Sequence, residues 1–341
     1  MTHIVASAPG KLVLLGEYAV LERAPALVLA VGRRARAALA PSGSHCWEII
    51  SPTLGLQGRL QLQHGEAIWH EAAPAELVWV ATLLARFPQV DRLHPCRIEL
   101  DSDAFYLDRA GARTKLGLGS SAALVVALLG ALHGVANIAP PTLGEAIAAH
   151  RAIQHGHGSG IDIAASLAGG MSRFQLEGDA ARAEPAKLPQ GLHWVCVFSG
   201  RPASTRAMLA TVAAWHEREP TMFAQYMHEL ATISSRGIDA LAAHDAAAFL
   251  SCLHDYATAL AHFGAAAGVD IVSREHRAIA AIAADCGCVY KSCGAGGGDI
   301  GVTFAVEDTR LREFSERALR AGYPVIGLEA DLKGLEVVSN I

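Results

Sequence analysis

The chain has 341 residues, of which 52% are hydrophobic and 18% are charged, and its formal net charge is −5. This composition excludes intrinsic disorder, and the length predicts two domains. The basic residues form no run and do not alternate with aromatic residues, which excludes a nucleic-acid partner. The longest apolar run, residues 122–132, is shorter than the roughly 18 residues of a membrane span, and no signal-peptide pattern precedes Lys11. We therefore expect a cytoplasmic protein without a membrane partner.

The first half of the sequence alternates short apolar segments with turn residues, and it contains segments of helical periodicity. The helix predicted over residues 121–135 is apolar on all sides, which predicts a buried helix, and Ser120 or Ser121 could cap it. The predicted strands are residues 4–8, 12–15, 26–31, 36–40, 47–50, 58–62, 96–100 and 171–175. The other predicted helices are residues 75–87, 143–153 and 162–167.

A polar, proline-containing segment at residues 177–191 is the best candidate for a domain boundary, so we predict domains at 1–185 and 186–341. Asp245 is expected to cap a helix of the second half. The strands predicted there are residues 194–198, 301–306, 325–329 and 335–338. The helices predicted there are residues 205–217, 222–242, 245–263, 273–284 and 309–320. The fold class predicted for the chain is therefore α+β.

Glycine-rich segments carry most of the functional signal. Lys11 follows Pro9-Gly10 and Glu17 follows Gly16, which puts a cation and a carboxylate near the ends of one strand, although an ordinary strand between turns looks similar. Residues 115–123, KLGLGSSAA, lead directly into the buried helix. Glycines let backbone N–H groups approach phosphate oxygens, and a helix N-terminus favours anions. This segment therefore predicts phosphate binding, although it has neither the GxxxxGK[ST] nor the GxGxxG order.

Two further glycine-rich segments follow. Residues 155–162, HGHGSGID, place the Asp162 carboxylate where a turn meets a helix. Residues 291–299, KSCGAGGGD, contain four glycines, and each glycine loses much conformational entropy on folding. We therefore expect the backbone to approach a ligand closely there. The seven cysteines are irregularly spaced, which favours reduced thiols over a metal site.

The order PGKLVLLGEY, GLGSSAA, GSGIDIAAS and GAGGGD is similar to that of the GHMP kinase superfamily of small-molecule kinases, and it spans residues 9–299. The resemblance implies a two-domain α+β GHMP kinase fold. Its N-terminal α/β domain would be of the ribosomal-protein-S5-like type, and its C-terminal domain would be a ferredoxin-like α+β domain. A decarboxylase of the same superfamily and a non-catalytic nucleotide-binding regulator are alternatives, and the regulator would be expected to have lost Lys11 or Asp162.

Within the superfamily the chain resembles the phosphomevalonate kinases most. AHRAIQ at residues 149–154, SGRPAST at 199–205 and GGGD at 296–299 are typical of that branch. Arg151 stands where mevalonate kinases usually have a metal-binding glutamate, whereas Cys293 stands where the family usually has serine. The resemblance implies ATP-dependent phosphorylation of mevalonate 5-phosphate to mevalonate 5-diphosphate. The alternative is a mevalonate kinase or another small-molecule GHMP kinase.

The resemblance also assigns roles to residues. Lys11 and Asp162 would be catalytic, Ser121 would ligate Mg²⁺, and Lys115 and Lys291 would offset phosphate charge. Asp162 would act as a base or orient Lys11 and the acceptor. ATP would be bound by Lys115, Gly117, Leu118, Gly119, Ser120, Ser121 and Ala122. The acceptor, a small molecule, would be bound by Glu17, Tyr18, Ser159, Gly160, Ser204, Thr205, Ser292, Gly294, Ala295, Gly296 and Gly297. The expected assembly is a monomer or a homodimer.

Overall fold

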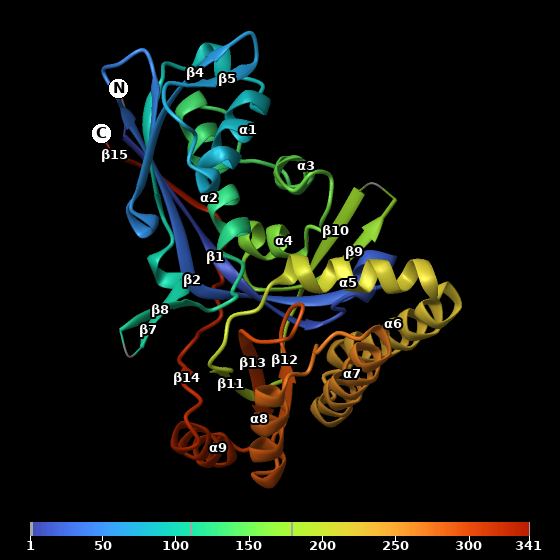
Figure 1. The fold of residues 1–341 in the computed structure, drawn as a ribbon. Helices are drawn as coiled ribbons and strands as arrows, with labels where there is room; N and C mark the ends of the chain where they lie inside the picture. The colour runs from blue at the N-terminus through green and yellow to red at the C-terminus, as the bar shows by residue number, and fades with distance from the viewer. Residues whose placement is uncertain (1–2, 110, 179, 341) are drawn as a thin grey trace.

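The computed structural model describes residues 3–109, 111–178 and 180–340. A large mixed sheet with helices on one face forms the first half, and a smaller antiparallel sheet between helices forms the second half (Figure 1). Both halves contribute residues to one pocket, which lies between the two sheets.

The large sheet contains nine strands among the described residues. Its order is β10-β9-β2-β6-β3-β4-β5, and β1 pairs with both β2 and β15; only the β3–β6 pair is parallel. The strands are β1 (His3–Leu15), β2 (Ala26–Pro41), β3 (Trp47–Ser51), β4 (Leu56–Gln63), β5 (Glu66–Trp69), β6 (Cys96–Asp101), β9 (Met171–Glu177), β10 (Ala180–Ala186) and β15 (Glu336–Asn340). A separate hairpin joins β7 (Tyr106–Arg109) and β8 (Ala112–Lys115).

The strand breaks expected from the sequence within residues 4–15 and 26–40 were wrong. β1 runs through Pro9-Gly10, and the pairing of β1 with β2 shifts register at that point instead of ending. A bulge of this kind bends a strand without terminating it. Lys11 therefore lies inside a long strand, directly after its irregular point.

Helices α1 (Val78–Arg86), α2 (Ser120–Ala136), α3 (Leu143–Ile153) and α4 (Ile161–Ala168) cover one face of the large sheet (Figure 1). α2 is buried on nearly all sides, as its apolar sequence predicted. The predicted serine cap is wrong, because the N-cap is Gly119 in the left-handed conformation and no side chain of the described residues caps this helix. Glycine reaches that conformation without the Cβ penalty that serine would incur.

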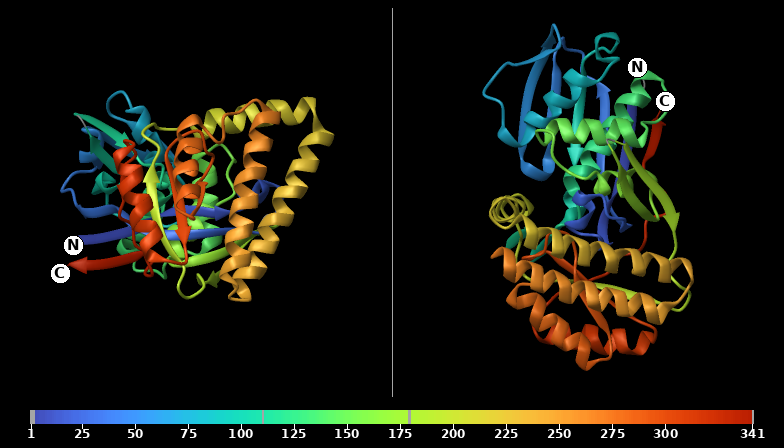
Figure 2. Two further views of the ribbon diagram at one scale, coloured as in Figure 1. Left: turned by 90° about the horizontal axis from the view of Figure 1, so that it is seen from below. Right: turned by 90° about the vertical axis from the view of Figure 1, so that its right-hand side faces the viewer.

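The second half follows the order β-α-β-β-α-β of a ferredoxin-like unit, except that four consecutive helices take the place of the first helix. Its sheet order is β12-β13-β11-β14, all antiparallel, and Figure 2 shows the helices stacked around it. The strands are β11 (His193–Phe198), β12 (Val289–Ser292), β13 (Ile300–Ala305) and β14 (Val325–Ile326). The helices are α5 (Thr205–Arg218), α6 (Pro220–Ala242), α7 (Ala246–Ala267), α8 (Arg274–Asp285) and α9 (Asp308–Arg320). Asp245 caps α7 as expected, since its side chain accepts from the Ala248 N–H at 2.9 Å.

Two segments do not follow the domain division that the sequence predicted. Residues 177–191, expected to be a boundary, contain β10, which forms a hairpin with β9. The last strand, β15, returns to pair with β1, so residues 336–340 belong to the sheet of the first half and the two termini lie side by side (Figure 1). The position of the domain boundary stays a prediction.

A shared core holds the two halves together. Leu12 and Leu29 of the large sheet belong to the same buried cluster as Phe249 of α7 and Phe304 of β13. α8 and α9 cover the opposite face of the small sheet, where Phe314 is fully buried. In the part of the chain that the structure describes, no helix combines the length and apolar character needed to cross a bilayer.

Candidate functional site

The four glycine-containing segments meet in one pocket between the two halves of the molecule. Gly117, Gly160 and Gly294 come from three of these segments, and Lys11 comes from the fourth. The pocket is lined by Lys11, Val13, Glu17, Tyr18, Val20, Leu21, Gly117, His150, Gln154, Gly158, Ser159, Gly160, Ile161, Asp162, Thr205, Leu209, Cys293, Gly294, Ala295, Gly296 and Asp299. Residues as far apart in the sequence as Lys11 and Asp299 therefore line one site.

The side chain of Lys11 lies between two glycine loops. The backbone N–H of Lys11 donates to Leu118 O at 2.9 Å, which ties β1 to the loop before α2. A Cβ added to Gly119 would lie 3.1 Å from Lys11 Cγ and Cε, and one added to Gly294 would lie 3.8 Å from its Nζ. The ammonium therefore reaches the space between residues 117–119 and residues 294–296, where an anionic ligand would have to lie to contact both loops.

Asp299 is a site residue that the sequence reasoning missed, although it ends the GAGGGD segment. Its Oδ1 accepts from the Ala203 N–H at 3.1 Å, and a Cβ on Gly117 would be 2.3 Å from its Oδ2. Burial raises the pKa of Asp299, opposed by the Ala203 N–H and by the charges of Lys11 and Lys115. Burial lowers the pKa of Lys115, opposed by Asp299. Asp299 thus joins the last glycine loop to the loop that precedes α2.

Glu17 lines the pocket and forms a buried ion pair with Lys291 of β12. Lys291 Nζ also donates to Ser292 O at 2.7 Å, whereas Glu17 Oε2 has no hydrogen-bond partner among the described residues. Burial raises the pKa of Glu17, and the Lys291 ammonium opposes this shift. The expectation that Lys291 offsets the charge of bound phosphate is wrong, because its charge is already paired with Glu17.

Asp162 lies in the first turn of α4 and lines the pocket together with Ser159. The preceding Gly160 has a φ of +87°, and a Cβ there would be 2.7 Å from Ile147, so only glycine fits. Ser159 Oγ accepts from the Ile161 N–H at 3.3 Å. This turn holds the half-buried Asp162 carboxylate on the side of the pocket formed by α3 and α4.

His150 and Gln154 of α3 also line the pocket, and the sequence reasoning missed both as site residues. The Gln154 amide nitrogen lies 3.1 Å from His150 Nε2, so an amide N–H donates to an unprotonated ring nitrogen. Burial lowers the pKa of His150, opposed by the charge of Asp162. Their spacing of four residues on a predicted helix was the available signal.

Several predicted residues lie differently from what the sequence suggested. Cys293 lines the pocket, whereas the adjacent Ser292 does not. Burial raises the pKa of the Cys293 thiol to about 12. Arg151 also lies outside the lining, since its Nε donates to Gly158 O at 3.1 Å and so supports the turn before Asp162.

Other predicted acceptor residues divide into two groups. Tyr18, Thr205 and Ala295 line the pocket, and Tyr18 OH donates to Ala295 O at 2.6 Å. Ser204 does not line it and instead caps α5, accepting from the Ala207 N–H at 3.4 Å. Gly297 also lies outside, and its hypothetical Cβ would be 3.0 Å from Met208 Sδ.

The glycine run at residues 294–298 has mostly a packing explanation. A Cβ on Gly296 would be 2.3 Å from Ile271 O, and one on Gly298 would be 2.6 Å from Arg201 O. The expected close approach of this backbone to a ligand stays a prediction, and it applies to Gly294 and Gly296, which line the pocket. Gly294 is the exception, because the atom its Cβ would meet is the Lys11 ammonium.

Of the predicted ATP loop, Gly117 lines the pocket and Gly119 contacts Lys11. Leu118, Ser120 and Ala122 are buried, so Leu118 and Ala122 could reach a ligand only through their backbone. Ser121 is exposed in the first turn of α2. Its hydroxyl suits Mg²⁺, which binds proteins through one or two oxygens while phosphates and waters supply the rest. No cluster of three or more His, Cys, Asp or Glu side chains suited to a metal occurs within the described ranges.

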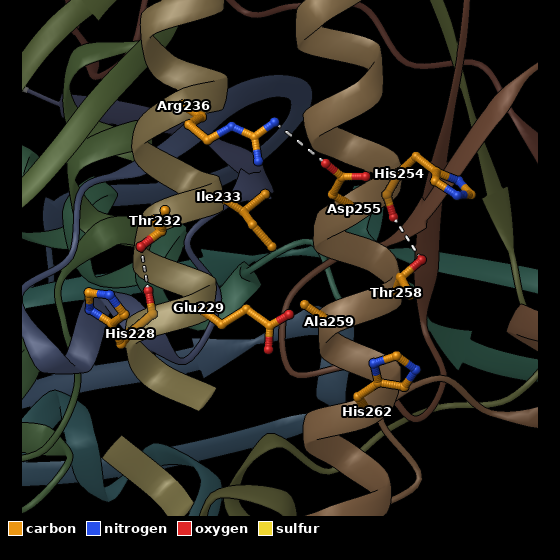
Figure 3. A pocket seen from close by; sticks show the side chains of 10 residues that line it. All are labelled: His228, Glu229, Thr232, Ile233, Arg236, His254, Asp255, Thr258, Ala259 and His262. Atoms are coloured by element: carbon orange, nitrogen blue, oxygen red, sulfur yellow. Dashed lines mark hydrogen bonds and ion pairs between the residues drawn. The ribbon is translucent and has the colours of Figure 1, made fainter. Parts of the chain in front are cut away.

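A second hollow lies between α6 and α7, away from the glycine loops (Figure 3). It contains His228, His254 and His262, and Arg236 pairs with Asp255 across the two helices at 3.7 Å. Figure 3 shows His228 and His254 on opposite outer sides of the helix pair. Because the histidines do not converge, this hollow lacks the geometry of a metal or catalytic site.

Comparisons with known proteins agree with this geometry. Residues 76–170 match the GHMP kinases N terminal domain. The chain is 26% identical to mevalonate kinase of Bos taurus over 93% of its length and 90% of that protein. It is 27% identical to phosphomevalonate kinase of Streptomyces sp. (strain CL190) over 97% of its length and 98% of that protein. The curated relatives are mainly mevalonate kinases.

The fold resembles that of Streptococcus pneumoniae phosphomevalonate kinase in complex with phosphomevalonate and AMPPNP, with a TM-score of 0.78. This similarity covers 96% of the present chain and 99% of that one, at 18% sequence identity. The fold class expected from the motifs is confirmed over the whole chain.

Proposed function

Because the chain belongs to the GHMP kinase superfamily, we propose that it transfers the γ-phosphoryl group of ATP to mevalonate 5-phosphate and so forms mevalonate 5-diphosphate. The superfamily supplies the reaction class, phosphoryl transfer. The acceptor is supported by the whole-length similarity to the Streptomyces phosphomevalonate kinase and by the GGGD segment that ends in Asp299.

One observation carries the assignment to phosphoryl transfer. The Lys11 ammonium lies between two glycine loops, in a pocket that also contains Asp162. Phosphoryl transfer needs little covalent chemistry from the protein, and its catalysis rests on positioning and on stabilising the charge of the transferred group. A lysine that reaches between two glycine loops meets both needs.

The roles of the residues follow from the acceptor's chemistry. Lys11 would contact the transferred phosphoryl group, and the N–H groups around Gly117 and Gly294 would contact phosphate oxygens. A phosphate monoester has a second pKa near 6, so it is already mostly dianionic at pH 7 and needs no general base. Asp162 would therefore orient Lys11 and the acceptor. Ser121 would hold Mg²⁺, which neutralises phosphate charge when bound.

Mevalonate is the second candidate acceptor, and a specific observation favours it. The described pocket lining contains the carboxylates of Asp162 and Asp299 against the ammonium of Lys11, while the third lining carboxylate, Glu17, is paired with Lys291. Like charges repel, and a second polyanion would bind beside ATP at a Coulomb cost that an uncharged C5 hydroxyl avoids. With this acceptor Asp162 would act as a base, because an alcohol must lose a proton of high pKa.

A coupled assay of ADP release, with Mg²⁺ and ATP, decides between these acceptors. We expect kcat/KM for mevalonate 5-phosphate to exceed that for mevalonate by at least about tenfold, the ratio that a 1.4 kcal/mol difference gives. Galactose and homoserine, acceptors of other GHMP kinases, are included in the assay as control acceptors. A preference for mevalonate selects the second candidate, and turnover of neither compound contradicts both.

A further inference from the structure

The imidazole of His276 lies directly behind the last glycine loop and is completely buried. Nε2 is 2.8 Å from Gly298 O, and Nδ1 is 2.7 Å from Tyr290 OH. Because a carbonyl oxygen can only accept, Nε2 carries the proton and Nδ1 accepts from the tyrosine hydroxyl. Burial lowers the pKa of His276, which agrees with this neutral tautomer.

The ring is held in place from two other elements. His276 lies in the first turn of α8, and its backbone N–H donates to the side-chain Oγ of the cap residue Ser273 at 3.4 Å. Tyr290 comes from β12, and a Cβ on Gly301 of β13 would be 2.1 Å from its hydroxyl oxygen. The hydroxyl can therefore reach His276 only because β13 has glycine at that position. A helix start, two strands and the ring together form a rigid support for the loop.

The same peptide group of the loop is also held from its other side. The carbonyl of Gly298 and the N–H of Asp299 belong to one planar unit. His276 Nε2 donates to the carbonyl, while the N–H donates to Arg201 O at 2.8 Å. Two hydrogen bonds to opposite sides of a planar group fix its rotation.

This fixed orientation matters because of the residue that follows. Asp299 has a φ of +59°, a conformation that costs energy in a residue other than glycine and needs surrounding structure to hold it. Its carboxylate is packed against Gly117 at the lining of the pocket. If the peptide between residues 298 and 299 rotated, the carboxylate would leave Gly117, and both glycine loops would change shape around Lys11.

We propose that His276 is a positioning residue of the kinase, which fixes the peptide group before Asp299 and thereby holds the Asp299 carboxylate against the loop at Gly117. The inference rests on the proposed phosphoryl transfer. His276 contacts neither the pocket nor a reacting group, so it acts entirely through the glycine loop.

Three substitutions test the inference. His276→Phe keeps the ring volume and removes both hydrogen bonds, whereas His276→Gln retains an N–H that can reach Gly298 O. Tyr290→Phe removes only the donor to Nδ1. We expect His276→Phe to lower kcat/KM at least about tenfold, and Gln to stay within about threefold of the wild type. We expect Tyr290→Phe to lie between them. Wild-type rates in His276→Phe, or equal losses in Phe and Gln, would overturn the proposal.

A double-mutant cycle with Asp299→Asn separates positioning from a loss of stability. If His276 acts through Asp299, His276→Phe lowers kcat/KM much less in the Asp299→Asn background than in the wild type. Full additivity of the two losses contradicts the proposal. All rates are compared at a temperature at which thermal unfolding shows each variant to be folded.

Hydrogen exchange gives a readout that needs no activity. The amides of residues 294–299 should exchange at least about tenfold faster in His276→Phe than in the wild type or His276→Gln. If the wild type phosphorylates no acceptor but the exchange differs in this way, the proposed function fails and the positioning of the loop stands. Unchanged exchange in His276→Phe refutes the positioning, whatever the activity.

Discussion

The carboxylate of Glu17 and the ammonium of Lys291 form an ion pair, although 274 positions separate them in the chain and their side chains are only 3% and 1% exposed. Glu17 follows β1 of the large sheet, and Lys291 belongs to β12 of the small sheet. Tyr256 of α7 donates to the backbone O of Glu17 at 2.8 Å. The pair therefore joins the two sheets at the lining of the pocket.

Removing one partner of this pair should destabilise the fold strongly. Lys291→Met leaves the Glu17 carboxylate buried without its counter-ion, and such changes typically cost about 3–5 kcal/mol of unfolding free energy. Replacing both, as Glu17→Leu with Lys291→Met, removes both buried charges and should recover most of that loss. Urea denaturation measures the unfolding free energy of the single and of the double variant. Lys333→Met is the control, because Lys333 is exposed and also has a glutamate partner, Glu336. If Lys291→Met loses no more unfolding free energy than Lys333→Met, the ion pair is not needed for stability.

The destabilisation by Lys291→Met should also depend on pH. Burial already raises the pKa of Glu17 above its ordinary 4.5, and loss of the lysine removes the main opposing effect. A carboxyl group with a raised pKa binds more protons in the folded state, so its folded state loses stability as pH rises above the unfolded value. We therefore expect the variant's deficit to be smaller near pH 5 than at pH 8. A deficit that grows on acidification contradicts this sign.

Gly117→Ala should disrupt the contact between the two loops. Its φ of +74° disfavours alanine, and the added methyl would lie 2.3 Å from Asp299 Oδ2. Gly65→Ala is a matched control, because Gly65 has a φ of +79° and no atom of the described residues lies within 4 Å of an added Cβ. The control should lose roughly 1–2 kcal/mol of stability from the backbone alone and keep its activity. Gly117→Ala should in addition lose most of its kcat/KM. If the two variants are equally active, the contact between Gly117 and Asp299 has no role in catalysis.

The sequence predicted the helices better than the arrangement of the strands. The helix predicted at residues 143–153 is observed over that range, because Thr142 and Glu145 form a local capping box that the sequence contains. The bulge at Pro9-Gly10 and the strand β10 depend on pairing with distant residues, which local propensity cannot supply.

The same division holds for the site. Lys11, Gly117, Asp162 and Gly294 were predicted from motifs, and the structure brings all of them to one pocket. The pairing of Lys291 with Glu17, and the outward position of Arg151, depend on which charges the fold brings into contact. A sequence shows which charges exist but not which of them neutralise each other.

Lys11→Ala and Asp162→Asn should each lower kcat on the order of a hundredfold or more, while the fold remains intact. Lys11 is the ammonium between the glycine loops, and Asp162 supplies a carboxylate on the α4 side of the same pocket. Circular dichroism and thermal unfolding check the fold, and the ADP-release assay measures the rate. Near-normal turnover in either variant rejects its assignment as catalytic.

Cys293 lines the pocket but should be a poor nucleophile. Burial raises the pKa of its thiol to about 12, so at pH 8 only about one molecule in 10⁴ carries the thiolate, the form that reacts with alkylating reagents. We expect iodoacetamide to label Cys293 at least about a hundredfold more slowly in the native protein than in urea, where an ordinary thiol has a pKa of about 8.5.

Labelling measured by peptide mass spectrometry between pH 7 and 9 tests this expectation. The rate in the native protein should rise about tenfold per pH unit over that whole range, because the thiolate fraction does so below the pKa. An ATP analogue or an acceptor that fills the pocket should slow it further, since Cys293 borders the same space as Lys11 and Asp299. A rate that levels off near pH 8 would show that the neighbouring Lys291 ammonium outweighs burial at this thiol.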